Sequence, residues 1–519
     1  MSKEQERAQL HATIWRVAND LRGSVDGWDF KAFILGTLFY RFISENLTDY
    51  VNRDQRSAGE TAFDYTELPD EEAEHGRDGL VQEKGFFIRP SELFCNVVAR
   101  AESDPDLNVT LDTIFKNIED SAVGTSSETK LEGLFSDMNL SSAKLGATTE
   151  ERNKKLVKIL KAVSEFQVGN FEDQTIDTFG DAYEFLMTMY ASNAGKSGGE
   201  FFTPQEVSEL LAKLTVVGRK KGEIKRVYDP CCGSGSLLLK FAKVLGKDAV
   251  KDGYFGQEIN LTTYNLCRIN MFLHGVNFDK FDIALGDTLL NPQHEGEQPF
   301  DAIVSNPPYS IRWEGDSNPV LINDQRFSPA GRLAPKGKAD LAFTMHMLSW
   351  LAITGTAAIV EFPGVLYRGG AEEQIRNYLI SNNYVDTVIQ LPSDLFFGTT
   401  IATCIIVLKK SKKTSDIFFI DASKEFVREG NKNKLKDANI EKILNAHIER
   451  KDIEHFAKVV ANDDVLANSC NLSISAYVEP ENTEEEIDIT ELNKKIFEIV
   501  KREDELRKAI DAIVADLER

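Results

Sequence analysis

Apolar residues in the first part of the chain recur at helical spacing. In one segment they stand four apart, which places them on one face of a helix: Phe30, Ile34, Leu38 and Phe42. The run NKKLVKILKAVSEF further on repeats this pattern, and no strand-like alternation stands out between the two. We therefore predict an N-terminal all-α domain over residues 1–170.

From residue 171 the pattern changes to short β-branched runs that alternate with helical stretches. Seven runs are predicted as strands: RVYD at 226, YFGQE at 254, FDIALGD at 281, AIVSN at 302, TAAIVEF at 356, YVDTVIQL at 384 and ATCIIVLK at 402. Strands that alternate with helices predict a doubly wound, mainly parallel α/β sheet of the Rossmann-like type. We assign this domain to residues 171–428. Ligands of such sheets bind at the carboxyl ends of the strands, where Glu258, Asp287 and Asn306 stand.

The last region, residues 429–519, is charged and is predicted to be helical. Near its end, apolar residues follow alternating steps of four and three, broken only at Glu503: Leu492, Ile496, Ile499, Leu506, Ile510, Ile513 and Leu517. Below, these seven residues are called the heptad seam. Two interpretations stay open, a helix that packs on its own domain and a coiled-coil-like helix that pairs with another subunit.

Composition and charge limit the partners of the chain. Its 519 residues are enough for two or three domains. A net charge of −23 repels bare polyphosphate, because affinity for nucleic acid is mostly electrostatic. If the site chemistry points to DNA, another component must supply most of the binding.

The cysteines and the N-terminus indicate a compartment. Six cysteines are scattered without CxxC or Cys/His ligand spacing, which argues against zinc and any other metal site and is typical of reduced cytosolic thiols. The N-terminal residues contain no apolar signal region, and no segment is long enough to span a membrane. We expect a cytoplasmic protein that does not contact membranes.

A loop rich in small residues follows the first predicted strand. In RVYDPCCGSGSLLLKFA, Gly233 and Gly235 allow a sharp turn close to a ligand, and the following helix offers free N–H groups. The loop is not the dinucleotide fingerprint GxGxxG and is a weak signal alone. Glu258, 23 residues beyond Gly235, stands at the usual distance for a carboxylate that binds ribose hydroxyls, and Asp287 would meet an adenine ring. A Walker lysine is absent, so an ATPase is disfavoured.

Two further segments contribute candidate chemistry. In EFFTPQ, Thr203 is a candidate helix cap with Pro204 at the first helical position, and the two phenylalanines either cover a bound ring or belong to the core. In NPPY, the Asn306 side-chain oxygen and the Pro307 carbonyl form a rigid pair of acceptors for the two hydrogens of an aromatic amine. Tyr309 could stack on the base, which in duplex DNA must first be flipped out.

DPCCGSG, Glu258, Asp287 and NPPY, with EFFTP ahead of them, resemble the amino-methyltransferases that use S-adenosyl-L-methionine (SAM). Specifically, the chain resembles the modification (M) subunit of type I restriction-modification systems over essentially its whole length. The resemblance implies transfer of a methyl group from SAM to adenine N6 in DNA. It also implies two sets of residues. The cofactor-binding residues are Glu200, Phe201, Phe202, Thr203, Pro204, Gln205, Asp229, Cys231, Cys232, Gly233, Ser234, Gly235, Glu258 and Asp287. The catalytic residues are Asn306, Pro307, Pro308 and Tyr309, and the residues of the target-base pocket are Asp340 and Phe343.

The same resemblance implies partners and a mechanism. A separate specificity (S) subunit would read the DNA, with two M subunits per S, and a restriction (R) subunit can join them. The N6 lone pair would attack the SAM methyl group in line, without a covalent enzyme intermediate. Cys231 lies in the cofactor loop, which argues against a role as the nucleophile of a cytosine-C5 methyltransferase. The segment 310–339, which carries five basic residues, is either a loop that orders on DNA or a plain surface loop.

Three other functions compete with this one. NPPY also marks protein-glutamine methyltransferases, which are usually smaller. Cytosine-N4 methyltransferases tend to have Ser where this chain has Asn306, so the asparagine favours adenine. A non-catalytic scaffold of the complex is the third, and the intact cofactor loop and NPPY argue against it.

Overall fold

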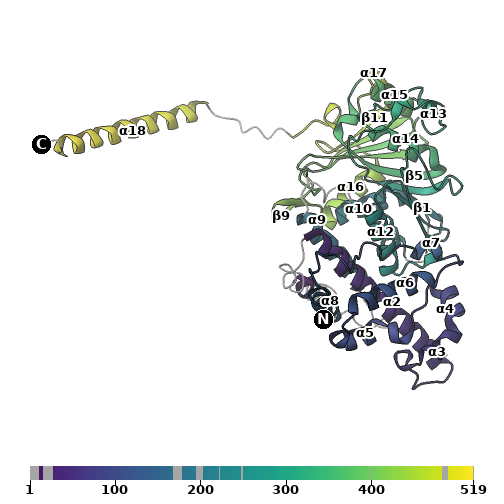
Figure 1. Ribbon diagram of the computed structural model, residues 1–519. Helices are drawn as coiled ribbons and strands as arrows, with labels where there is room; N and C mark the ends of the chain where they lie inside the picture. Colours follow the sequence, from purple (N-terminus) through teal and green to yellow (C-terminus); the bar gives the residue numbers. More distant parts are fainter. Residues whose placement is uncertain are drawn as a thin grey trace. The chain divides into compact units, whose positions relative to one another are not determined.

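The computed structural model describes residues 11–15, 27–166, 178–193, 203–220, 222–246, 249–397, 399–481 and 489–517. The chain divides into two units, Met1–Val478 and Glu479–Arg519 (Figure 1). The first unit contains the helical N-terminal region and the whole sheet. The second contains one long helix.

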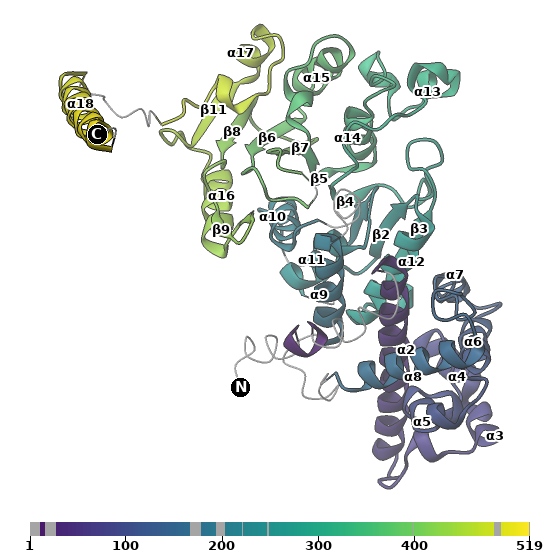
Figure 2. The same ribbon diagram turned by 60° about the vertical axis from the view of Figure 1, so that its left-hand side comes forward.

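The N-terminal region is helical, as its apolar spacing predicts. Its helices are α2 (Gly27–Ser57), α3 (Asp70–Ala73), α4 (Arg77–Lys84), α5 (Phe94–Arg100), α6 (Leu107–Asp120), α7 (Glu128–Leu131) and α8 (Thr149–Ser164). α2 packs against α5, α8 and the later helix α9 (Thr178–Asn193), with Ile34, Leu38 and Phe42 buried (Figure 2). α8 begins with a capping box between Thr148 and Glu151, which satisfies its first N–H groups.

All seven predicted strands are present in one nine-stranded sheet. They are β1 (Arg226–Asp229), β2 (Gly253–Glu258), β3 (Phe281–Leu285), β4 (Phe300–Ser305), β5 (Leu351–Glu361), β6 (Val385–Gln390) and β7 (Cys404–Lys409). Two further strands, β8 (Asp416–Asp421) and β11 (Ala457–Ala461), complete the sheet. The order is β11-β8-β6-β7-β5-β4-β1-β2-β3, and β7 runs antiparallel to both of its neighbours. The sheet is therefore mixed and mostly parallel, which confirms the predicted fold class.

The strand order reverses at β1, which pairs in parallel with β2 on one side and with β4 on the other. Connections from such a pair leave toward opposite ends of the sheet, so a crevice opens at the carboxyl ends of the two strands. Those ends are Asp229 and Ser305. The fold thus places the predicted cofactor loop and the NPPY turn side by side.

Helices cover both faces of the sheet, so successive side chains of a central strand are buried in opposite cores. One face carries α10 (Gln205–Val216), α11 (Ser236–Leu245) and α12 (Leu261–Leu273), and the other carries α14 (Asp340–Trp350) and α15 (Ala371–Ser381) (Figure 2). In β4, Ala302 and Val304 join the first core while Ile303 joins the second. This period of two is what a strand buried on both sides requires.

The prediction of a helical region from residue 429 needs a correction. β11 (Ala457–Ala461) pairs antiparallel with β8 (Asp416–Asp421) and forms the edge of the sheet, so residues 457–461 are not helical. β9 (Val427–Glu429) and β10 (Lys432–Lys434) form a separate hairpin, followed by α16 (Asp437–Glu449) and later by α17 (Asn462–Ala467). β9 and β10, of three residues each, are too short to give a clear pattern, and β11 is a five-residue strand among charged residues. The predicted domain boundaries at 170 and 428 stay predictions.

The second unit is the helix α18 (Ile489–Leu517), whose 29 residues carry the heptad seam. The exposed fraction of the seam side chains runs from 45% at Leu492 to 81% at Leu517. A long helix with an apolar seam is typical of coiled coils, and the pairing of this one, within this chain or with another, is a prediction.

Candidate active site

The cofactor loop begins at Asp229, the last residue of β1. Its Oδ1 accepts hydrogen bonds from the Cys231 N–H (3.0 Å) and from the Ser305 hydroxyl at the end of β4 (3.0 Å). Its Oδ2 is buried and has no partner among the residues that the structure describes. Burial raises the pKa of Asp229 to about 7, with a smaller contribution from the charge of Glu258 and against the effect of the two hydrogen bonds. One buried carboxylate oxygen is therefore free for a cationic or donor group of a ligand.

The glycines of the loop are required by their backbone angles and by close packing. Gly233 and Gly235 have φ of 52° and 80°, in the left-handed region that favours glycine. A Cβ at Gly235 would come within 2.7 Å of the Cys267 Sγ in α12. The loop also joins the next strand, because the Cys232 N–H donates to the Gln257 carbonyl (3.0 Å).

The two predicted strand-end acids hold backbone groups around this loop. Glu258 accepts from the Gly233 N–H (3.1 Å) with Oε2 and from the Asn260 N–H (2.9 Å) with Oε1. Burial raises its pKa. Asp287, two residues beyond β3, accepts from the N–H groups of Leu289 (2.9 Å) and Leu290 (3.2 Å). Each oxygen of Glu258 keeps a second lone pair for a ligand's hydroxyl. Asp287 makes both of its bonds with Oδ1, so its Oδ2 is the oxygen left for a ligand's amine.

The EFFTPQ segment reaches the active site through Thr203, in a way that differs from the sequence prediction. Pro204 is itself the N-cap of α10, and no side chain caps this helix. The Thr203 hydroxyl instead accepts a hydrogen bond from Asn306 Nδ2 (3.0 Å). Glu200, Phe201 and Phe202 lie outside the described residues, so their predicted roles stay predictions. Gln205 lines a separate pocket, which is described below.

The NPPY turn follows β4 directly and is held at both ends. The Tyr309 hydroxyl donates to Asn306 Oδ1 (2.7 Å), while Asn306 Nδ2 donates to Thr203. These two bonds fix which way the amide faces. The Ser310 N–H donates to Asp340 Oδ1 (2.8 Å), which secures the backbone after the prolines. The amide oxygen retains one lone pair for a ligand. Stacking of Tyr309 on a base stays a prediction.

The target-base residues predicted from the KADLAF motif divide between two environments. Asp340 begins α14, is buried, and keeps one oxygen, Oδ2, without a partner in the described part of the chain. Phe343 is packed into the apolar core on its face of the sheet. The structure thus brings Asp340 to the turn and assigns Phe343 to the core.

The sequence reasoning overlooked Glu361, which ends β5. Its Oε1 accepts from the Thr344 hydroxyl (2.8 Å), and its Oε2 is buried without a partner among the described residues. Burial raises its pKa well above the ordinary value, and the charge of Asp340 adds to this effect. The signal was present in TAAIVEF, because an acid stands next to the end of this predicted strand.

Arg326 anchors the segment 310–339 to the protein. Its guanidinium is buried and donates to the carbonyls of Thr288 (2.8 Å) and Leu289 (2.7 Å), just after Asp287. It also pairs with Asp324 (2.7 Å) and contacts His346 Nδ1 (3.2 Å). The structure therefore shows Arg326 as an internal anchor. Contact of the rest of this segment with DNA stays a prediction.

Comparisons with known proteins place these features in a family. The family model described as N-6 DNA Methylase matches residues 174–486, and the HsdM N-terminal domain model matches residues 10–163. The type I restriction enzyme MpnII methylase subunit of Mycoplasma pneumoniae is 48% identical over 99% of this chain and 97% of its own. The chain belongs to the N-6 DNA methylases, as a type I restriction-modification methylase subunit.

Other relatives agree with this assignment of the methylase subunit. The MjaVIII methylase subunit of Methanocaldococcus jannaschii is 33% identical, over 72% of this chain and 66% of its own. The crystal structure of the type I restriction-modification system methyltransferase subunit from Streptococcus thermophilus is 36% identical, with a TM-score of 0.83. It covers 91% of this chain and 100% of its own. Among the described residues, no helix of the methylase subunit is long and apolar enough to cross a membrane.

Proposed function

We propose that the methylase subunit transfers a methyl group from SAM to N6 of adenine, in a DNA site chosen by a separate specificity subunit. The observation that carries this proposal is the Asn306 amide. Its nitrogen is bound to Thr203 at 3.0 Å and its oxygen to Tyr309 at 2.7 Å. An acceptor fixed in this way, with a lone pair to spare, suits an N–H donor such as adenine N6.

The residues around the loop fit SAM. The free Oδ2 of Asp229 suits the ammonium group of its methionine part, because an opposite charge favours the ionised carboxylate. Glu258 would accept from the ribose hydroxyls, and Asp287 would meet the adenine ring. SAM supplies an electrophilic methyl group when bound.

The acceptors act on the amine as its charge develops. When the N6 nitrogen gains a methyl group it becomes positive, and its two hydrogens bind acceptors more strongly. The Asn306 oxygen and the Pro307 carbonyl would stabilise this charge without reorganising, because both residues precede a proline and are restricted to extended angles.

The Asn306→Ala variant tests the proposal. We expect methyl transfer to fall by at least about a hundredfold, the usual cost of removing one preorganised polar group from an active site. SAM affinity should change only a few-fold. The assay uses the methylase subunit purified together with the specificity subunit encoded beside it, with base-resolved detection of methylation in genomic DNA.

Asn382→Ala, at the exposed C-terminal end of α15, serves as the matched control and should retain full activity. Full activity of Asn306→Ala would contradict the proposal, and so would methylation of cytosine N4 in place of adenine. Methylation of a protein glutamine by the wild-type complex would support the rival function.

We further propose that the complex contains two methylase subunits per specificity subunit and that a restriction subunit joins it. A net charge of −23 supports the need for a separate DNA-binding subunit, because so acidic a chain binds DNA poorly by itself. The mass of the purified assembly measures the ratio.

A further inference from the structure

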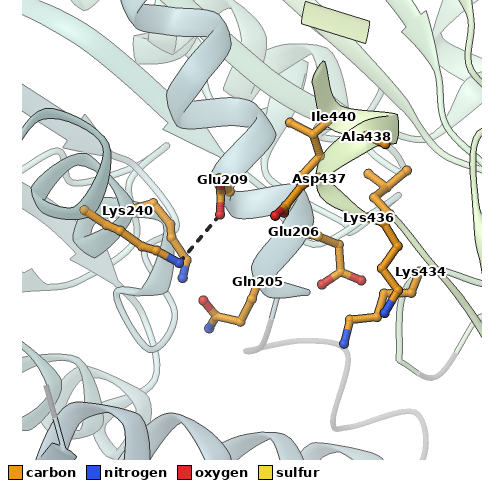
Figure 3. Close-up of a pocket in the computed structure, with 11 residues that line it drawn as sticks. Gln205, Glu206, Glu209, Lys240, Lys434, Lys436, Asp437, Ala438 and Ile440 are labelled. Atoms are coloured by element: carbon orange, nitrogen blue, oxygen red, sulfur yellow. Dashed lines mark ion pairs between the residues drawn. The ribbon is translucent and has the colours of Figure 1, made fainter. Parts of the chain in front are cut away.

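A second pocket lies between the N-terminal ends of two helices, outside the active site. It is a hollow of about 420 Å³ lined by residues of α10, α11, β10 and α16. Figure 3 shows Gln205 and Glu206 at the start of α10, with Lys240 on one side and Lys434 and Lys436 on the other. Its volume is within the range of roughly 300–1,000 Å³ typical of small-molecule sites.

Lys240 is the feature of this pocket that calls for a ligand. Its side chain belongs to α11 and is only 6% exposed. No hydrogen bond or ion pair joins its ammonium to any residue that the structure describes. Burial lowers its pKa, although Glu184 and Glu209 attract its charge from a distance. A buried ammonium without a partner is costly, and an anion in the pocket would remove that cost.

The other lysines of the pocket add to its positive character. Lys243 lies 3.7 Å from Glu209, but Glu209 is already bound by Lys213 at 2.8 Å. Lys434 and Lys436 likewise share one carboxylate, Glu429. Each of these two carboxylates therefore pairs with two lysines, and one negative charge cannot neutralise two positive charges.

The N-terminal ends of α10 and α16 also favour an anion in this pocket. α10 and α16 are 12 and 13 residues long, and the first residues of both line the pocket. The N-terminal end of a helix carries a partial positive charge and offers N–H groups to an anion. Gln205 adds a buried amide nitrogen that has no partner among the described residues. Glu206 in the first turn of α10 and Asp437 in the first turn of α16 are lining acids that oppose an anion, so the lysines must outweigh them.

We propose that this pocket binds a phosphate group. The group is either free, as in inorganic phosphate or a nucleotide, or part of a DNA strand. Lys240 supplies the central charge, the starts of α10 and α16 supply donors, and the shared lysines supply the surrounding field. The site is distinct from the cofactor loop and does not depend on the proposed function.

Calorimetric titration of the full chain with inorganic phosphate tests the proposal, at pH 8 in chloride buffer of constant ionic strength. The wild-type chain should bind, and Lys240→Met, which keeps the apolar stem, should bind at least about tenfold more weakly. Lys225→Met removes the same charge from an exposed position outside the pocket and should bind as the wild type does. Absence of phosphate binding by the wild-type chain would overturn the proposal, as would equal affinities of the two variants.

Glu206→Gln gives a second measurement with the opposite sign, which holds even if Lys240→Met fails to fold. Removing the opposing carboxylate should tighten phosphate binding by about threefold, because it lies within the screening length of the bound anion. Weaker binding by Glu206→Gln would contradict the proposal. Neither titration involves methyl transfer, so their failure leaves the proposed function untouched.

The salt dependence of DNA binding by the assembled complex identifies the source of the phosphate. If the pocket holds a backbone phosphate, Lys240→Met should lower the slope of log affinity against log salt by about one. If it holds a free phosphate or a nucleotide, the slope should stay unchanged and phosphate should not compete with DNA. Either result keeps the phosphate site and assigns its source.

Discussion

Asp229 combines three properties that are rarely found together in one carboxylate. It is buried, one of its oxygens is bonded to its own loop at Cys231 and to the end of β4 at Ser305, and the other has no partner in the described structure. Burial raises its pKa to about 7, from an ordinary value near about 4. Between these two values the folded chain keeps a proton that the unfolded chain has released. The stability of the free protein therefore falls as the pH rises through this range.

SAM binding should depend on pH in the opposite direction. A cationic ligand favours the ionised carboxylate, so we expect SAM affinity to rise with pH and level off above about 7, by up to about tenfold per pH unit below that value. Asp229→Asn should bind SAM about tenfold or more weakly and show no such rise. Titration calorimetry between pH 5.5 and 8.5 measures both effects.

Asp252→Asn, an exposed change at the opposite end of β2, is the control for this experiment and should follow the wild-type curve. A wild-type affinity that does not change with pH would show that Asp229 does not bind the ammonium group.

At the scale of elements, one arginine joins two loops that the sequence separates. Arg326 belongs to the segment 310–339, yet it binds the carbonyls that follow Asp287. The segment 310–339 and the Asp287 loop, predicted to lie beside the target base and the cofactor adenine, therefore share one buried guanidinium. Both edges of the active site depend on this cation.

Replacing Arg326 by Met should lower the free energy of unfolding by about 3 kcal/mol, because it strands Asp324 and two carbonyls without their donor. SAM affinity should fall as well, since the Asp287 loop loses its anchor. Urea unfolding and SAM titration measure the two effects. Arg332→Met, an exposed change in the same segment, should stay within about 0.5 kcal/mol of the wild type. Equal effects of the two variants would refute the anchor.

At the scale of the whole molecule, α18 is a unit of its own with an exposed apolar seam. We predict that truncation after residue 481 leaves the unfolding temperature and SAM affinity of the first unit unchanged. It should abolish co-purification with the specificity subunit, because the seam is the predicted contact.

Point changes separate the seam from the helix that carries it. Ile499→Ser together with Leu506→Ser should also weaken the complex, whereas Glu498→Ser with Glu505→Ser, off the seam, should not. If the truncated chain still binds the specificity subunit, the seam packs on its own domain and is not the contact.

The sequence predicts those parts of the molecule that rest on local patterns. The seven strands were readable because short β-branched runs are local signals, and the acids at their ends could be picked out in the same way. β9 and β10 were missed because three residues give no pattern, whereas β8 and β11 are no shorter than β1 and were overlooked beside the charged segments around them. The Thr203–Asn306 bond and the pocket around Lys240 join residues about a hundred positions or more apart, so only the folded chain reveals them.

The bond between Thr203 and Asn306 has a thermodynamic consequence, because it can couple the binding of SAM to the binding of the target base. It connects the segment predicted to touch SAM with the amide predicted to hold the base. If SAM binding steadies Thr203, it tightens base binding by some factor, and reciprocity requires the base to tighten SAM by the same factor. Removing only the hydroxyl, in Thr203→Val, should reduce that factor toward one. Measuring SAM affinity with and without target DNA then gives the coupling free energy of a single hydrogen bond.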